Sequence, residues 1–217
     1  MSKINYEERE KMIRTEWFKD HRAVFSDCGM FKTLEWGNPG TSNYWLRAII
    51  SKRTLIIYGD IGDAIYQWSQ ELDWQWLSGL GLGYFSGKCQ ASEEGRQYVD
   101  WDDEAAQSWL ETCFKDEEEQ RAADMEEWDE DKRKAYAEKH PTMRQRFEDA
   151  SGAGNLFSQM EWNMFLHDNG HEIFGDDLSS VAECGQVIAQ RCQAHLIAIK
   201  MAVESVSHGL TTVATGK

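Results

Sequence analysis

The fold of this chain is decided in TSNYWLRAIISKRTLIIYGDIGDAIYQWS, residues 41–69, its densest apolar stretch. Two segments rich in β-branched and aromatic residues, Asn43–Ile50 and Thr54–Tyr58, flank the polar triplet Ser51-Lys52-Arg53. Strand-forming runs joined by a short polar loop are typical of an antiparallel β-hairpin. We therefore predict a hairpin with a three-residue turn at the centre of the fold.

A bend rich in glycine and aspartate, Gly59–Asp63, ends the second strand of this hairpin. The residues that follow, Ala64–Gln70, fit helical spacing, and a carboxylate can accept hydrogen bonds from the first N–H groups of a helix. We therefore predict that Asp60 or Asp63 caps a helix that begins at Ala64. Two carboxylates after a strand also suit Mg²⁺, so the alternative is a metal-dependent enzyme that acts on nucleotides or nucleic acid.

The residues before the hairpin predict one helix and one further strand. Tyr6–Asp20 has the apolar and charged faces of an amphipathic helix, and Phe31–Trp36 alternates as a strand does. The turn Gly37–Gly40 then leads directly into the hairpin. The predicted fold class is α+β, with a small antiparallel sheet of three to four strands in the N-terminal third, packed with helices, and a mostly helical C-terminal part.

The length of 217 residues is enough for one domain with a sizeable core. Within this single domain, 1–217, we distinguish an α/β part with the central hairpin at 1–100, an acidic helical part at 101–150, and C-terminal helices at 155–207. The glycine-rich segment 151–154 reads as a linker between the last two parts.

The C-terminal third carries two helical patterns. The first, Leu156–Leu166, has Asn155 as its expected N-cap and ends at Asp168-Asn169-Gly170, a typical helix stop. The second, Val187–Val206, is the longest amphipathic stretch of the chain, and we predict a core helix there. The last residues, Ser207–Lys217, are expected to form a frayed tail.

The cysteine content and hydropathy of the chain indicate its compartment. Five cysteines are an odd number, they lack paired spacing, and the first residues are highly charged. This usage is typical of a reducing cytosol, and no run approaches the roughly 20 apolar residues that a membrane span needs. We expect a cytoplasmic protein of a bacterial host cell that does not associate with membranes.

The chain is strongly acidic, with a net charge of −15 and a pI of about 4.8. Direct binding to a phosphate backbone is therefore disfavoured, and a protein or ribonucleoprotein partner with a basic surface is favoured. The window Trp101–Ala150 holds 17 acidic residues against 8 Lys and Arg, which accounts for −9 of the total. Its apolar residues keep helical spacing, so we predict helices with one acidic face.

These acidic helices are the predicted binding surface. Carboxylates along a helix offer Lys and Arg side chains the same sign of charge as a nucleic-acid backbone, and an interleaved aromatic residue can act as an anchor. The alternative is an outer helical face that is only solvated. The predicted partner-binding residues are Glu117, Glu118, Glu119, Glu126, Glu127, Trp128, Asp129 and Glu130.

Other catalytic and metal-binding patterns are weak. His167 and His171 are four residues apart, as in a zinc protease, but the glutamate of that motif is missing and a helix stop lies between them. Cys184, Cys192 and His195 match no standard zinc spacing, and the last two lie on an apolar helix face, so we expect them in the core. We predict no cofactor and no catalytic residues.

Two sequence segments resemble segments of other proteins. LIIYGDIGDAIYQWS, residues 55–69, and YFSGKCQAS, residues 84–92, resemble a pattern found in uncharacterised proteins of bacteriophages and prophages. The similarity covers residues 36–92 and extends to CQAHLIAIKMA, residues 192–202. It brings no catalytic residue with it. An acidic phage protein without enzyme motifs is also similar in character to anti-CRISPR and other anti-defence inhibitors.

The sequence thus predicts an inhibitory binding protein encoded by a phage rather than an enzyme. Its acidic surface would block a basic, nucleic-acid-handling surface of a host defence complex. A further alternative is a phage accessory protein that associates with itself as a homodimer, with the tryptophan-rich segment Trp68–Trp76 as the contact.

Overall fold

The computed structural model describes residues 4–93, 99–152, 158–176, 178–207 and 212–215. The chain forms two compact units. The sheet unit combines Ile4–Asp100 with Ile188–Lys217, and the helical unit contains Trp101–Val187. The chain thus leaves the sheet unit and returns to it. The single-domain organisation stays a prediction, because compactness does not report whether the two units unfold together.

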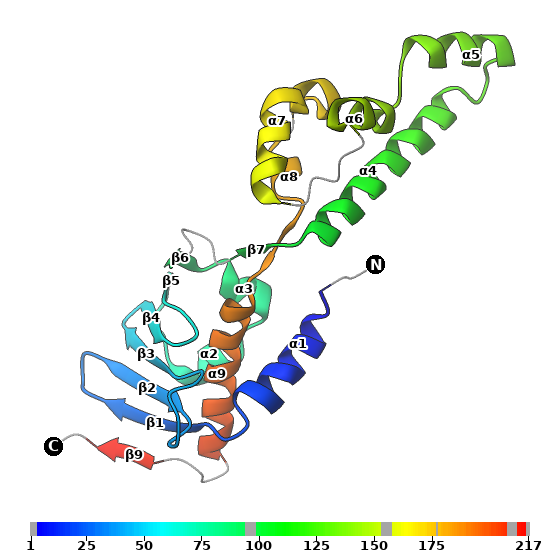
Figure 1. The fold of residues 1–217 in the computed structure, drawn as a ribbon. Coiled ribbons are helices and arrows are strands. Elements are labelled where there is room, and N and C mark those ends of the chain that lie inside the picture. The colour runs from blue at the N-terminus through cyan, green and yellow to red at the C-terminus, as the bar shows by residue number, and fades with distance from the viewer. Residues whose placement is uncertain (1–3, 94–98, 153–157, 177, 208–211, 216–217) are drawn as a thin grey trace. The chain divides into compact units, whose positions relative to one another are not determined.

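The elements follow one another along the chain as Figure 1 labels them. The helices are α1 (Tyr6–Met12), continued by the π-helical turn η1 (Ile13–Trp17), α2 (Trp74–Ser78), α3 (Leu82–Ser86), α4 (Asp103–Asp124), α5 (Glu130–Lys139), α6 (Met143–Ser151), α7 (Gln159–Phe174), α8 (Leu178–Ala182) and α9 (Gln190–Ser207). The strands are β1 (Arg22–Asp27), β2 (Lys32–Gly37), β3 (Leu46–Ser51), β4 (Thr54–Gly59), β5 (Ala64–Gln67), β6 (Cys89–Ser92), β7 (Val99–Trp101), β8 (Gln186–Ile188) and β9 (Thr212–Thr215).

The main sheet is an antiparallel meander. Strands β1 to β6 pair in chain order, and β9 adds to β1 in parallel, which gives the order β6-β5-β4-β3-β2-β1-β9. The predicted central hairpin is β3 and β4, although Ser51 pairs with Thr54, so that its loop has two residues rather than three. The α+β fold class is confirmed, and the sheet has more strands than the three to four predicted.

The helix predicted at Ala64–Gln70 is wrong. Ala64–Gln67 is strand β5, which pairs with β4 on one side and with β6 on the other. Ala64 and Tyr66 are buried whereas Ile65 and Gln67 are exposed, which is the alternation of a strand. Four residues are too few to separate a period of two from a helical period, so the neighbouring strands decide this element.

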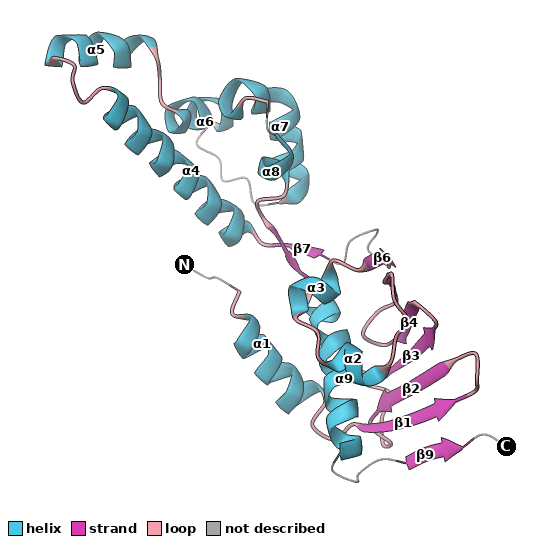
Figure 2. Ribbon diagram, turned by 180° about the vertical axis from the view of Figure 1, so that it is seen from behind, coloured by secondary structure: helices cyan, strands magenta, loops and turns pink. Residues whose placement is uncertain are grey.

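The core of the sheet unit lies between the sheet and helices η1, α2, α3 and α9, all on one face of the sheet (Figure 2). The predicted core helix at Val187–Val206 is α9, which buries Leu196, Ile197 and Ile199, whereas Val187 and Ile188 belong to strand β8 instead. The largest fully buried side chains of this unit are Phe18, Trp36, Tyr66 and Phe85. On the opposite face, Ile49, Ile56 and Ile65 stand side by side across β3, β4 and β5.

The tryptophan-rich segment Trp68–Trp76 belongs to this same core. Trp68 is buried, its ring lies 6.0 Å from that of Trp76, and Trp74 packs against Phe25. These side chains therefore stabilise the sheet unit. Homodimer formation through this segment stays a prediction.

The helical unit has a core of its own, formed by α4, α6, α7 and α8. Trp162 of α7 is 1% exposed and donates a hydrogen bond from Nε1 to the carbonyl oxygen of Val181 at 2.9 Å. The other buried apolar residues are Leu110, Phe114, Phe165, Leu166, Ile173 and Val181. The predicted acidic helical part consists of α4, α5 and α6; α4 buries Ala106, Leu110 and Phe114, whereas α5 and α6 contain no fully buried residue.

The predicted helix stop at Asp168-Asn169-Gly170 is wrong, because α7 continues to Phe174. Gly170 is buried, and a Cβ at that position would lie 3.1 Å from Leu178 of α8. Close packing of the two helices thus offsets the low helix propensity of glycine, about 1 kcal/mol relative to alanine. The observed N-cap of α7 is Ser158, whereas the expected cap Asn155 lies outside the described residues.

The prediction of a frayed tail at Ser207–Lys217 is wrong in part, since Thr212–Thr215 forms β9 beside β1.

In the part of the chain that the structure describes, no helix combines the length and apolar character that a membrane crossing requires.

Candidate functional site

The predicted partner-binding residues lie in α4, in α5 and in the connection between them, which Figure 1 labels. Both helices begin with an aspartate cap, since Asp102 accepts from the Ala105 amide at 2.9 Å and Asp129 accepts from the Lys132 amide at 2.8 Å. Further acidic residues fill each first turn, where they favour the positive end of the helix dipole. Some of the acidic residues therefore stabilise these helices.

The predicted partner-binding carboxylates on α4 form ion pairs within the unit. Glu118 pairs with Arg144 of α6 at 3.2 Å, Glu117 with Arg121 at 3.7 Å, and Glu119 with Lys115 at 3.4 Å. Arg144 also forms a hydrogen-bonded pair with Glu111 that lowers the pKa of this carboxyl. Consequently Glu117, Glu118 and Glu119 offer a partner less uncompensated charge than the sequence predicts.

The carboxylates in the connection between α4 and α5 differ from those of α4 in their contacts. Glu126, Glu127 and Glu130 are exposed, and no ion pair within the described residues involves their carboxylates. Arg133 donates to the carbonyl oxygens of Glu126 at 2.7 Å and of Trp128 at 2.9 Å. A cation thus fixes the backbone of this segment while its carboxylates stay in solvent. We call Glu126–Glu130 the acidic turn.

Trp128 of the acidic turn packs against side chains of α5. Its ring is half-buried, lies 5.3 Å from Tyr136 in an edge-to-face arrangement, and carries the Lys132 ammonium 4.2 Å from its centroid. Trp128 and Tyr136 also line a shallow hollow of about 350 Å³ together with residues of α4. Trp128 therefore stiffens the turn by local packing and leaves one part of its ring accessible.

Asp60 and Asp63 do not cap a helix, because a strand follows them. The Asp60 carboxylate accepts from the Tyr44 amide at 2.7 Å, and the Asp63 carboxylate accepts from the Gly59 amide at 3.2 Å. Each carboxylate thus holds a different loop segment near the end of β4. Within the described residues, no group of three His, Cys, Asp or Glu side chains is placed to hold a metal ion.

Cys192 and His195 lie in the core of the sheet unit, as predicted, and both are 0% exposed. The Tyr66 hydroxyl lies 3.0 Å from His195 Nδ1, and His195 Nε2 lies 3.2 Å from the carbonyl oxygen of Gly62. Because a carbonyl only accepts, Nε2 carries the proton and Nδ1 accepts from Tyr66. The histidine thus ties α9 to β5 and to the bend at Gly62. Cys184 packs against the other core.

Burial lowers the pKa of His195 from 6.5 to about 4, and this predicts a pH-dependent stability. As the pH falls, the unfolded chain takes up the proton at a higher pH than the folded protein does. The contribution of the neutral His195 to the free energy of unfolding is therefore complete above about pH 6.5 and is lost toward pH 4. The total loss is about 3 kcal/mol, since one pKa unit corresponds to about 1.4 kcal/mol. Denaturant unfolding between pH 7 and pH 4 measures it.

The matched variants for this measurement are His195→Gln and His167→Gln. Removing the buried imidazole should flatten the pH profile between pH 6.5 and 4, whereas removing the exposed one should leave it parallel to that of the unaltered protein. Parallel profiles for all three proteins would show that His195 does not carry the pH dependence.

Comparisons with known proteins give no family for this chain. No protein-family model matches it, and neither the curated proteins nor the solved structures give a match. The class that the geometry defines is therefore an α+β protein with an acidic helical unit.

The sequence did not predict the ion pairs of Arg144 or the hydrogen bonds from Arg133 to the backbone of the acidic turn. Arg144 lies 26 and 33 residues from its partners Glu118 and Glu111. Charge counting along the chain cannot pair groups so far apart.

Proposed function

We propose that this chain is an inhibitory binding protein whose acidic turn occupies a basic, nucleic-acid-binding surface of another protein or ribonucleoprotein. The observation that carries the proposal is the set of uncompensated, exposed carboxylates at Glu126, Glu127 and Glu130, held on a backbone fixed by Arg133. A backbone that is already fixed loses little conformational entropy on binding. The carboxylates attract a basic surface over a distance that salt shortens.

The charge of the whole chain supports the same proposal. A net charge of −15 favours encounter with basic surfaces and opposes binding to nucleic acid itself. The part of the Trp128 ring that stays accessible beside the carboxylates would add apolar contact to a mainly electrostatic interface.

The biological setting that we propose rests on the resemblance of residues 55–69 and 84–92 to proteins of bacteriophages and prophages. In that setting the partner is a host defence complex that handles nucleic acid, and the inhibitor acts in the bacterial cytosol by steric block, as an anti-CRISPR does. Neither a cofactor nor catalysis is needed for such a role.

The experiment is an affinity capture with the full chain from a bacterial lysate that contains defence systems, at about 50 mM and 300 mM salt, followed by mass spectrometry. We expect a nucleic-acid-binding protein that is retained at low salt and displaced both by higher salt and by added DNA or RNA. A retained protein that nucleic acid does not displace would contradict the proposed mode of binding.

The acidic turn itself is tested by Glu126→Gln/Glu127→Gln/Glu130→Gln. We expect the affinity for the captured partner to fall about tenfold or more at low salt, because three uncompensated charges are lost, with little change in the melting temperature. The matched control removes three exposed carboxylates of the sheet unit, Glu7→Gln/Glu8→Gln/Glu71→Gln. Equal losses for both variants would mean that net charge, and not the acidic turn, determines binding.

A further inference from the structure

The outer face of the main sheet, which is the face that the helices of the sheet unit leave uncovered in Figure 2, is apolar at its centre. Ile49, Ile56 and Ile65 stand opposite one another on β3, β4 and β5, and Ile65 is 40% exposed. Val24 of β1 adds a side chain that is 36% exposed. An antiparallel sheet that faces water on one side usually places polar residues there. Apolar side chains that adjoin one another across three strands instead indicate a surface for a partner.

This outer face carries little charge, although the chain is strongly acidic. Among the residues of β1–β6 whose side chains point to it, the charged ones are Arg22, Glu35 and Arg47, so two positive charges and one negative charge give +1. The whole chain has a net charge of −15. Like charges oppose contact, so a second acidic copy meets less repulsion at this face than at the acidic helices.

The polar centre of the face has the pattern that a two-fold dimer needs. Arg47 pairs with Glu35 on the neighbouring strand and donates to the Tyr58 hydroxyl at 3.1 Å, and the Arg47 and Glu35 side chains are 39% and 43% exposed. A two-fold axis along the strands between β2 and β3 exchanges these strands, which places Arg47 of each copy over Glu35 of the other. The same rotation places Ile49 over Thr33, its register partner. The face is therefore complementary to itself in charge.

We propose that the outer face of the sheet is a homodimer interface, in which two copies pack face to face as the sheets of a β-sandwich do. Strands about 4.8 Å apart, with a rise of about 3.3 Å per residue, give β1–β6 a face of about 500 Å². Two such faces bury about 1,000 Å², the lower limit of a specific interface. We therefore expect a weak dimer with a Kd in the micromolar range. The interface shares no residue with the acidic turn.

The test is analytical ultracentrifugation of the full chain from about 5 to 500 µM, at about 50 mM and 500 mM salt. A reductant keeps the five cysteines as thiols. We expect the dimer fraction to increase with protein concentration and with salt, because salt screens the repulsion between two acidic copies. Binding through the acidic turn weakens with salt, so the two proposals have opposite salt dependences. A chain that stays monomeric throughout, or a dimer that salt dissociates, would overturn the dimer interface.

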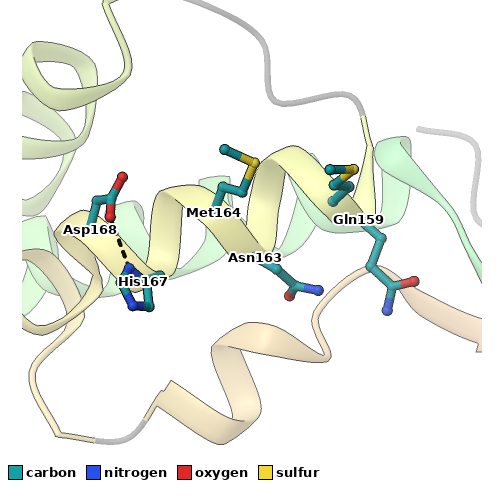
Figure 3. Close-up of a pocket in the computed structure, with 6 residues that line it drawn as sticks. Gln159, Asn163, Met164, His167 and Asp168 are labelled. Carbon is teal, nitrogen blue, oxygen red and sulfur yellow. Dashed lines mark hydrogen bonds and ion pairs between the residues drawn. The ribbon is translucent and has the colours of Figure 1, made fainter.

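The apolar part of the interface is tested by Ile49→Thr/Ile56→Thr, because threonine keeps the β-branched shape that suits a strand. We expect the dimer Kd to rise at least tenfold. The matched control is Met160→Gln/Met164→Gln, a pair of exposed apolar side chains on α7 that border a shallow hollow of the helical unit (Figure 3). This control should leave the Kd unchanged. Equal effects of the two variants would place the contact elsewhere and overturn the proposal.

The two-fold arrangement is tested by exchange of charge. Glu35→Arg leaves two positive charges at the centre of the face and Arg47→Glu leaves two negative ones, so each variant alone should dimerise at least tenfold more weakly. An equimolar mixture should form heterodimers, because opposite charges then face each other across the axis. A fluorescent label on one variant reports the heterodimer during sedimentation. Failure of the two folded variants to associate would contradict the arrangement.

Discussion

Replacing Gly59 by alanine should destabilise the sheet unit by about 3 kcal/mol or more, and it should lower the yield of folded protein. Gly59 ends β4 with a φ of +144°, a conformation that side chains rarely adopt. An added Cβ would collide with the Trp45 carbonyl oxygen and lie 2.8 Å from Leu46 Cα, which are backbone atoms where the neighbouring strand β3 begins. Denaturant unfolding measures the loss.

The matched control for this variant is Gly83→Ala in α3. Gly83 has no atom within 4 Å of a Cβ built on it, so alanine should be neutral or stabilise by about 0.5–1 kcal/mol through higher helix propensity. Opposite effects of the same substitution would identify the positive φ of Gly59 and the close backbone approach to Trp45 together as the cause. A Gly59→Ala protein as stable as the parent would contradict the observed register.

Trp162→Ala should destabilise the helical unit by about 3–5 kcal/mol, the usual cost of removing a buried aromatic side chain. The ring is stacked on Phe165 at 5.9 Å, and the indole N–H binds the carbonyl oxygen of Val181. We expect hydrogen exchange to accelerate in α4, α6 and α7, while β3 and β4 keep their protection, because the two units have separate cores.

The graded control is Trp162→Phe, which keeps a six-membered aromatic ring and removes the donor to Val181 together with part of the ring volume. Its cost should be smaller, about 1–3 kcal/mol for the carbonyl left without a partner. Loss of protection in both units at once with Trp162→Ala would contradict independent unfolding. That result would instead support the single cooperative domain predicted from the sequence.

The local pattern of the sequence determined the N-terminal architecture. The alternation in Phe31–Trp36 placed β2, and the β-branched and aromatic residues of Asn43–Ile50 and Thr54–Tyr58 placed β3 and β4. The long apolar periodicity of α9 likewise predicted its burial, including that of Cys192 and His195. These elements carry enough residues for their period to be read unambiguously.

Tertiary structure decided what short or distant segments do. Strand β5 exists because β4 and β6 supply its hydrogen bonds, and α7 continues through Gly170 because Leu178 packs against it. Strand β6 follows β5 only after α2 and α3, and Leu178 belongs to the next helix, so neither contact is visible in the local sequence pattern.

The same distinction separates the acidic residues. Composition alone identified residues 101–150 as the acidic part of the chain. Only folding brings Arg144 to Glu111 and Glu118 and directs Arg133 to the backbone of the acidic turn, which leaves Glu126, Glu127 and Glu130 uncompensated. The sequence thus determined the amount of negative charge, whereas the tertiary structure decided where that charge remains available, because ion pairs depend on distance in space and not along the chain.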